Sequence, residues 1–99
     1  MAIMEIGVVP IGTGSTSVGE FVVKMHEFLM EKGIPHELTD MGTNIEGDMG
    51  QLLEIAGALH EVPFSMGAQR VYTVIKIDDR RDREVHLGSK KESVQERTG

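Results

Sequence analysis

The chain has 99 residues, which suits one domain, and its 39% hydrophobic residues are enough for a small packed core. Its formal net charge of −6 argues against nucleic-acid binding, because phosphate backbones require a basic surface. Without cysteine, the chain can form no disulfide, no thiolate metal site and no cysteine nucleophile.

The charges are spread unevenly, with an acidic body and a mixed tail. From Asp79 onward six basic and five acidic residues give a net charge of +1, while the first 78 residues carry −7. An acidic body favours small cations over anionic polymers as ligands. No apolar run approaches the length of a membrane span, and the N-terminus lacks a basic region followed by an apolar one. We therefore expect a cytoplasmic protein that has neither a membrane nor a nucleic acid as its partner.

The first third of the sequence predicts a strand followed by an amphipathic helix. Residues 3–9 are rich in Ile and Val and end before Pro10, as is typical of a short strand. Ser17 and Glu20 have capping-box spacing and Gly33 is a good C-terminal stop, so a helix is expected between them. Its apolar side chains recur at three- and four-residue steps and form one stripe: Val18, Phe21, Val22, Met25, Phe28 and Leu29.

The middle of the sequence predicts two short strands and a second helix. Residues 35–41 and 43–47 form the strands, and Gly42 between them marks a bulge or a turn. Asp48 begins the helix with a second capping-box spacing, and Pro63 ends it. The buried stripe of this helix is expected to be Leu52, Ile55, Ala56 and Leu59.

The last third predicts a strand and a charged tail. Val71–Asp78 alternates apolar and polar residues, and the tail of residues 81–99 is expected to hold a short helix around Arg81–Leu87. The order β-α-β-β-α-β in residues 1–80 predicts an α+β, ferredoxin-like domain, with a four-stranded antiparallel sheet and both helices on one face. Apolar residues on the other face need a cover, and a second copy of the chain is the simplest one.

The turn between the first strand and the first helix is the first candidate site. Residues 10–20 hold three glycines and four hydroxyl side chains. Such a turn leaves backbone N–H groups free at a helix N-terminus, where a small polar or anionic ligand can bind. It departs from the strict phosphate motifs, because Ser17 replaces the third glycine of the dinucleotide fingerprint and Glu20 replaces the P-loop lysine. We expect either a ligand-binding loop or a tight turn whose hydroxyls cap the helix.

The second candidate site is the strand of residues 43–48. Period-two alternation places Thr43 and Ile45 on one face of this strand and Asn44 and Glu46 on the other. A buried carboxylate requires a partner, so Glu46 could accept hydrogen bonds from an amino group or balance a cationic ring. The alternative is a solvated carboxylate at a strand end.

No catalytic or metal site is evident in the sequence. No local base accompanies the hydroxyls of the first turn, so we expect neither an enzyme nor a cofactor. Arg70 is a candidate ligand contact because its planar fork binds oxygen pairs, whereas the mixed charges of Asp78–Arg83 predict a solvated surface or a subunit interface. The histidines lie too far apart in the sequence to predict a metal site: His26, His36, His60 and His86.

A set of short segments gives a more specific indication. Together, from about residue 3 to residue 83, they resemble the small thiamine-binding-protein family, long catalogued as a domain of unknown function. The segments are Pro10-Ile-Gly-Thr-Gly-Ser, Ser17-Val18, Met41-Gly-Thr-Asn-Ile-Glu-Gly-Asp48, His60-Glu61, Phe64, Gly67, Arg70-Val71 and Ile75-Lys-Ile-Asp-Asp-Arg80.

The resemblance implies a ferredoxin-like fold, homodimers with their sheets packed together, and homotetramers built from two dimers. It implies that thiamine or its hydroxymethylpyrimidine part binds in a pocket lined by Thr13, Gly14, Thr43, Ile45 and Glu46. Glu46 would accept the aminopyrimidine N–H, and the acidic surroundings would favour the thiazolium charge. We therefore expect an oligomeric small-molecule-binding protein without catalytic activity. The alternative is a structural or regulatory oligomer with no physiological small-molecule ligand, in which the Gly-rich turn only shapes subunit contacts.

Overall fold

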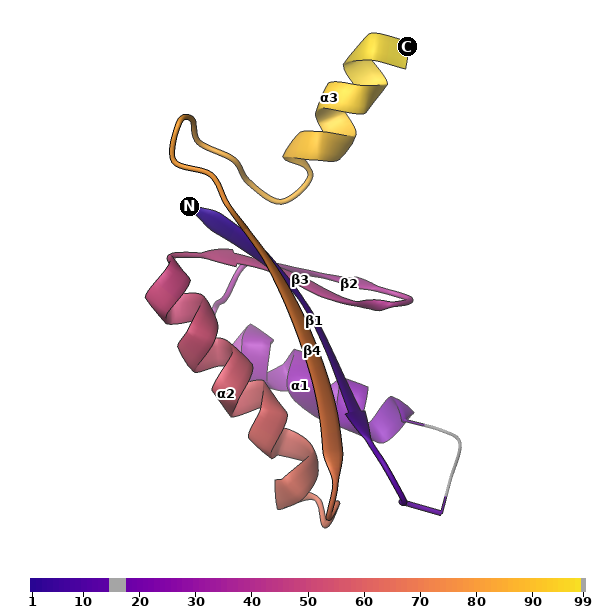
Figure 1. Cartoon of the computed structure of the whole chain (residues 1–99). Coiled ribbons are helices and arrows are strands. Elements are labelled where there is room, and N and C mark those ends of the chain that lie inside the picture. Colours follow the sequence, from indigo (N-terminus) through magenta and orange to yellow (C-terminus); the bar gives the residue numbers. More distant parts are fainter. Residues whose placement is uncertain (15–17, 99) are drawn as a thin grey trace.

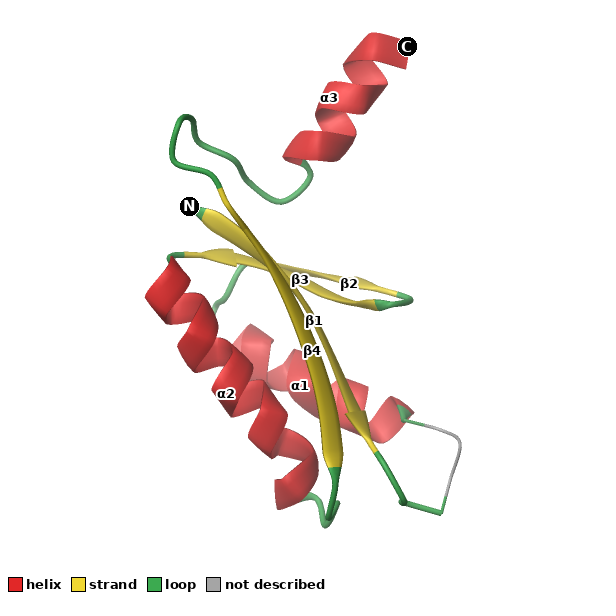
Figure 2. Ribbon diagram, viewed as in Figure 1, coloured by secondary structure: helices red, strands yellow, loops and turns green. Residues whose placement is uncertain are grey.

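In the computed structural model, which describes residues 1–14 and 18–98, an antiparallel sheet carries two helices on one face, and a third helix stands beyond its end (Figure 1). The strand order β2-β3-β1-β4 confirms the predicted α+β, ferredoxin-like arrangement (Figure 2). The elements in chain order are β1 (Ala2–Pro10), α1 (Gly19–Glu31), β2 (His36–Thr39), β3 (Gly42–Gly47), α2 (Met49–Ser65), β4 (Val71–Asp79) and α3 (Ser89–Thr98).

The hydrophobic core lies between the sheet and the helices α1 and α2. Alternate residues of β1 point into it, and its cross-strand pair of Met4 and Ile45 is completely buried. The predicted stripe of α2 is buried against this face, together with Leu29 of α1. The apolar period of the second helix therefore identified its packed face, whereas in the stripe predicted for α1 only Leu29 is buried and Met25 and Phe28 are partly buried against the core.

The helix ends differ in part from the capping expected from the sequence. Gly33 adopts a φ of 64° just after α1, as predicted for a C-terminal stop. Val18 occupies the N-cap of α1 and makes no side-chain capping bond, and Ser17 lies outside the described residues. Asp48 is the N-cap of α2, but its side chain makes no capping bond either, so the second capping box is not formed.

The prediction that Pro63 ends the second helix is wrong. Helix α2 runs on to Ser65, and Pro63 is buried inside its last turn. A proline lacks one N–H donor, but its carbonyl still accepts, here from the N–H groups of Met66 at 3.1 Å and Ala68 at 3.0 Å. Burial of the ring and these two bonds let the helix continue for one more half-turn.

The position of the tail helix was also predicted wrongly. Residues 81–87 have no helix, and α3 begins at Ser89, after Gly88 with a φ of 87°. Arg81 is bonded back to Asp79 instead, and the N–H of Leu87 donates to the side chain of Glu46, so tertiary contacts override the local helical pattern. Among the described helices, none is both long enough and apolar enough to cross a membrane.

Candidate ligand-binding site

The C-terminal arm, defined here as residues 80–98, first turns back toward the open face of the sheet near the start of β1 and then runs away from the sheet as α3 (Figure 1). A hollow of about 720 Å³ lies between the arm and the strands. Small-molecule sites in proteins commonly have volumes of about 300–1,000 Å³, so this hollow has the size of a ligand site.

The floor of the hollow is a polar row that crosses all four strands. Glu37 of β2 pairs with Asn44 of β3, which pairs with Glu5 of β1, which pairs with Lys76 of β4. All four residues line the hollow, and the Lys76 Nζ lies 3.6 Å from a Glu5 carboxylate oxygen. Lys76 can offset the charge of one of the two carboxylates, so the row as a whole keeps a negative charge. The Asn44 amide can both donate and accept hydrogen bonds.

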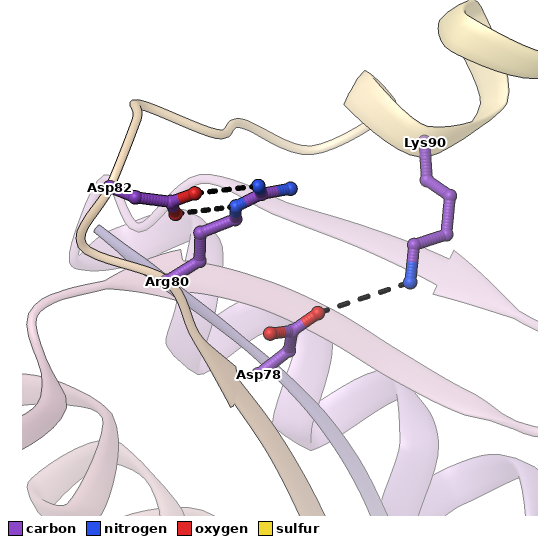
Figure 3. A network of polar contacts seen from close by, with 4 residues as sticks. All are labelled: Asp78, Arg80, Asp82 and Lys90. Carbon is purple, nitrogen blue, oxygen red and sulfur yellow. Dashed lines mark hydrogen bonds and ion pairs between the residues drawn. The ribbon is translucent and has the colours of Figure 1, made fainter.

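The roof of the hollow comes from the arm and joins the sheet through ion pairs. The Nζ of Lys90 in α3 lies 3.9 Å from a carboxylate oxygen of Asp78 at the end of β4 (Figure 3). In the turn between them, Arg80 donates two hydrogen bonds to the Asp82 carboxylate, at 2.6 and 2.7 Å (Figure 3). The Lys90–Asp78 pair is exposed and holds the arm only weakly, and the Arg80–Asp82 pair lies within the arm itself.

Glu46 provides the most buried attachment of the arm. One of its carboxylate oxygens accepts the backbone N–H of Leu87 at 3.0 Å, and the other lies 3.3 Å from Nδ1 of His86. The Glu46 side chain is only 13% exposed. Chiefly through the Leu87 N–H, and against the effect of burial, the pKa of Glu46 is lowered from its ordinary value. Glu46 is therefore ionised at neutral pH and positions the wall of the hollow.

The other predicted site residues of β3 lie on the helix side of the sheet. Ile45 is completely buried and belongs to the hydrophobic core. Thr43 pairs with the buried Ile6 and shares its face. Neither residue lines the hollow under the arm.

The Gly-rich turn lies at the opposite end of β1. Its described glycines, Gly12 and Gly14, have φ values of 77° and 79°, a conformation that side chains with a Cβ rarely adopt. The N–H of Ile11 donates to the Arg70 carbonyl at 2.8 Å, which places the turn beside Arg70. The eight residues from Ile3, which pairs with Glu46, to Pro10 span about 23 Å, so Thr13 and Gly14 cannot reach Glu46 within one chain.

The floor residues Glu5 and Glu37 escaped the sequence analysis, and Asn44 entered it only as a neighbour of Glu46. Period-two alternation shows which residues of one strand share a face. It does not show which residues of different strands stand in the same row, because that depends on the register between strands. Each strand therefore shows in its own sequence which polar residues share a face, but the sequence does not show that these residues form one row across the sheet.

Comparisons with known proteins agree with the fold. A family model described as thiamine-binding protein matches residues 4–95. The UPF0045 protein YqgV of Bacillus subtilis is 44% identical over 98 residues, which cover 95% of this chain and 94% of that protein. The structure of the hypothetical protein MJ1052 from Methanocaldococcus jannaschii matches with a TM-score of 0.85 at 29% identity, covering 96% of both chains. A Thermotoga maritima protein provisionally assigned to thiamine biosynthesis or salvage has a TM-score of 0.75 at 18% identity, covering 94% of this chain and 97% of that one.

Proposed function

Because the chain belongs to the thiamine-binding protein family, we propose that it binds thiamine or a related hydroxymethylpyrimidine without catalysis, in the hollow under the C-terminal arm. The observation that carries this proposal is the polar row of Glu37, Asn44, Glu5 and Lys76 on the floor of a hollow of about 720 Å³. The carboxylates and the amide of this row provide the hydrogen-bond acceptors that an aminopyrimidine needs.

The chemistry of the floor suits both halves of thiamine. A carboxylate of Glu5 or Glu37 accepts a hydrogen bond from the amino group of the pyrimidine, and the Asn44 amide N–H donates to a ring nitrogen. The hollow as a whole is lined by three carboxylates and six basic side chains, so a thiazolium cation would lie against the floor and Asp78 rather than against the basic arm. Leu87 and Val94 of the arm supply apolar contact from above.

The uncovered half of the open face supports the oligomeric part of the proposal. Beyond the arm, Val9, Tyr72 and Val74 are 44%, 60% and 43% exposed, and Val9 pairs directly with Tyr72. A second copy that packs its own open face here would bury this apolar patch and form a homodimer, which could pair again into a homotetramer. The Gly-rich turn lies at the same end, so Thr13 and Gly14 would lie beside the partner copy.

Isothermal titration calorimetry with thiamine and with hydroxymethylpyrimidine tests the ligand. We expect saturable binding to the full chain and a loss of about 10- to 100-fold in affinity for Asn44→Ala or Glu37→Gln, because the first removes a hydrogen-bonding amide and the second a charged acceptor. Glu46→Gln should weaken binding less, because Glu46 acts through the arm. Glu54→Gln is the matched control, since Glu54 is an exposed carboxylate on α2, away from the hollow.

Two results would contradict the proposal. Absence of heat with both ligands at millimolar concentration would show that the protein binds neither of them. Unchanged affinity in Asn44→Ala and Glu37→Gln would show that the ligand does not bind in the hollow under the arm. Native mass spectrometry of freshly purified protein reports the number of subunits and any bound small molecule together. An oligomer without any bound molecule or measurable titration would favour the structural or regulatory alternative.

A further inference from the structure

Two histidines that are ten residues apart in the sequence meet between helix α1 and the edge strand β2. Nε2 of His36 lies 3.1 Å from Nδ1 of His26. The ring centroids are 4.8 Å apart, and the rings are inclined at 70°. The contact lies on the exposed outer side of the molecule and is separate from the hollow under the arm.

The backbone fixes the protonation of one of these rings. Nδ1 of His36 lies 2.7 Å from the carbonyl oxygen of Ile34, which can only accept, so this nitrogen carries a proton. In the neutral ring, Nε2 of His36 then carries the lone pair, 3.1 Å from Nδ1 of His26. Histidines that bind metals show the same arrangement, in which a backbone carbonyl holds one ring nitrogen and leaves the other for the metal.

The spacing of the two nitrogens fits a shared metal ion. Zinc binds histidine nitrogens at about 2.0–2.1 Å, so two such ligands at angles of 90–110° lie about 2.9–3.4 Å apart. The observed separation of 3.1 Å falls inside this range. The described residues contain no group of three or more His, Cys, Asp or Glu placed to hold a metal, so water would complete the coordination.

We propose that Nδ1 of His26 and Nε2 of His36 bind one divalent transition-metal ion of the zinc, nickel or copper class. Imidazole nitrogens are preferred ligands of these metals, and a net charge of −6 favours cations in general. With two protein ligands and an exposed position, the site is exchangeable rather than structural. It is independent of the small-molecule site.

Titration of the untagged, full-length protein with zinc chloride tests this site. We expect one zinc ion per chain, and NMR shift changes at the ring nitrogens of His26 and His36. His26→Ala and His36→Ala should each weaken zinc binding by about tenfold or more. His26 is exposed on α1, so its variant keeps the fold and carries the test even where His36→Ala proves unstable.

The matched control is His86→Ala, which removes another exposed histidine that has a carboxylate partner. It should bind zinc like the unaltered protein. No binding at millimolar zinc would mean that the two rings share only an N–H···N hydrogen bond, and would overturn the proposal. Equal affinity in His26→Ala, or a loss of affinity in His86→Ala instead, would overturn it as well.

Discussion

On the helix-covered face of the sheet Met4 and Ile45 are completely buried, whereas on the open face Tyr72 and Val74 remain 60% and 43% exposed. Both faces belong to the same strands and alternate residue by residue. The difference shows that the apolar side chains of one chain are enough to bury one face of its sheet. The other face remains available to a ligand or to a second protein surface.

The open face is itself divided into two halves. Toward the start of β1, the arm stands over the charged row that includes Glu5 and Lys76. Toward the end of β1, Val9, Tyr72 and Val74 have no cover among the described residues. A polar half under an arm suits a small polar ligand, and an apolar half without a cover suits a second protein surface.

The largest effect is expected on the helix-covered face. Leu52 of α2 is 0% exposed and its neighbour Leu53 is 49% exposed. Leu52→Ala should lower the free energy of unfolding by about 2–5 kcal/mol, because it leaves a cavity in the core. Leu53→Ala should change it by no more than about 0.5 kcal/mol. Urea denaturation of both variants measures the difference, and equal losses would show that the two positions are packed alike.

The next effect concerns assembly through the apolar half. Val74→Glu places a charge within this half and should raise the dissociation constant of the oligomer by about tenfold or more, because burial of an unpaired charge is costly. Val23→Glu is the matched control, since Val23 is an apolar residue of α1 that is 56% exposed. Analytical ultracentrifugation measures both. Unchanged assembly in Val74→Glu would mean that this half is not an interface.

A smaller effect concerns the attachment of the arm to Glu46. The pKa of this carboxyl is lowered in the folded protein, chiefly because the N–H of Leu87 donates to the carboxylate. The stabilisation is therefore fully present above the ordinary glutamate pKa of 4.5 and is lost as the pH falls through the lower value of the folded state. Removal of the carboxylate in Glu46→Gln should lower the free energy that holds the arm on the sheet by about 1–2 kcal/mol.

NMR can follow this attachment directly. The amide resonance of Leu87 should titrate with a midpoint below 4.5, and this titration should be absent in Glu46→Gln. A midpoint at or above 4.5, or the same titration in Glu46→Gln, would show that the carboxylate does not hold the arm.

The sequence predicted the layers of the fold because its apolar residues recur with clear periods. The stripe of α2 and the alternation of β4 led to the correct elements and to their correct faces. The prediction that Pro63 ends the second helix was wrong because it considered only the local effect of a proline and not its burial. The prediction of a helix around Arg81–Leu87 was wrong because long-range contacts determine the conformation of that segment. Local sequence patterns contain no information on such tertiary contacts.

The candidate site was only partly predictable for the same reason. Glu46 was identified as a carboxylate in need of a partner, but that partner, Leu87, lies 41 residues further along the chain. The polar row needs the register of three strand pairs, and the contact between His26 and His36 needs the packing of α1 beside β2. The arm and the register, rather than any single motif, bring the functional residues together.

The smallest effect is expected where the arm leaves the sheet. Two hydrogen bonds from Arg80 lower the pKa of Asp82 to about 2. In Arg80→Gln, NMR titration of the Asp82 carboxyl should return its pKa toward the ordinary 3.8. The Tm should stay unchanged, because both side chains are exposed and an exposed ion pair contributes little to folding. A clear fall in Tm would mean that this pair contributes more to folding than an exposed ion pair does.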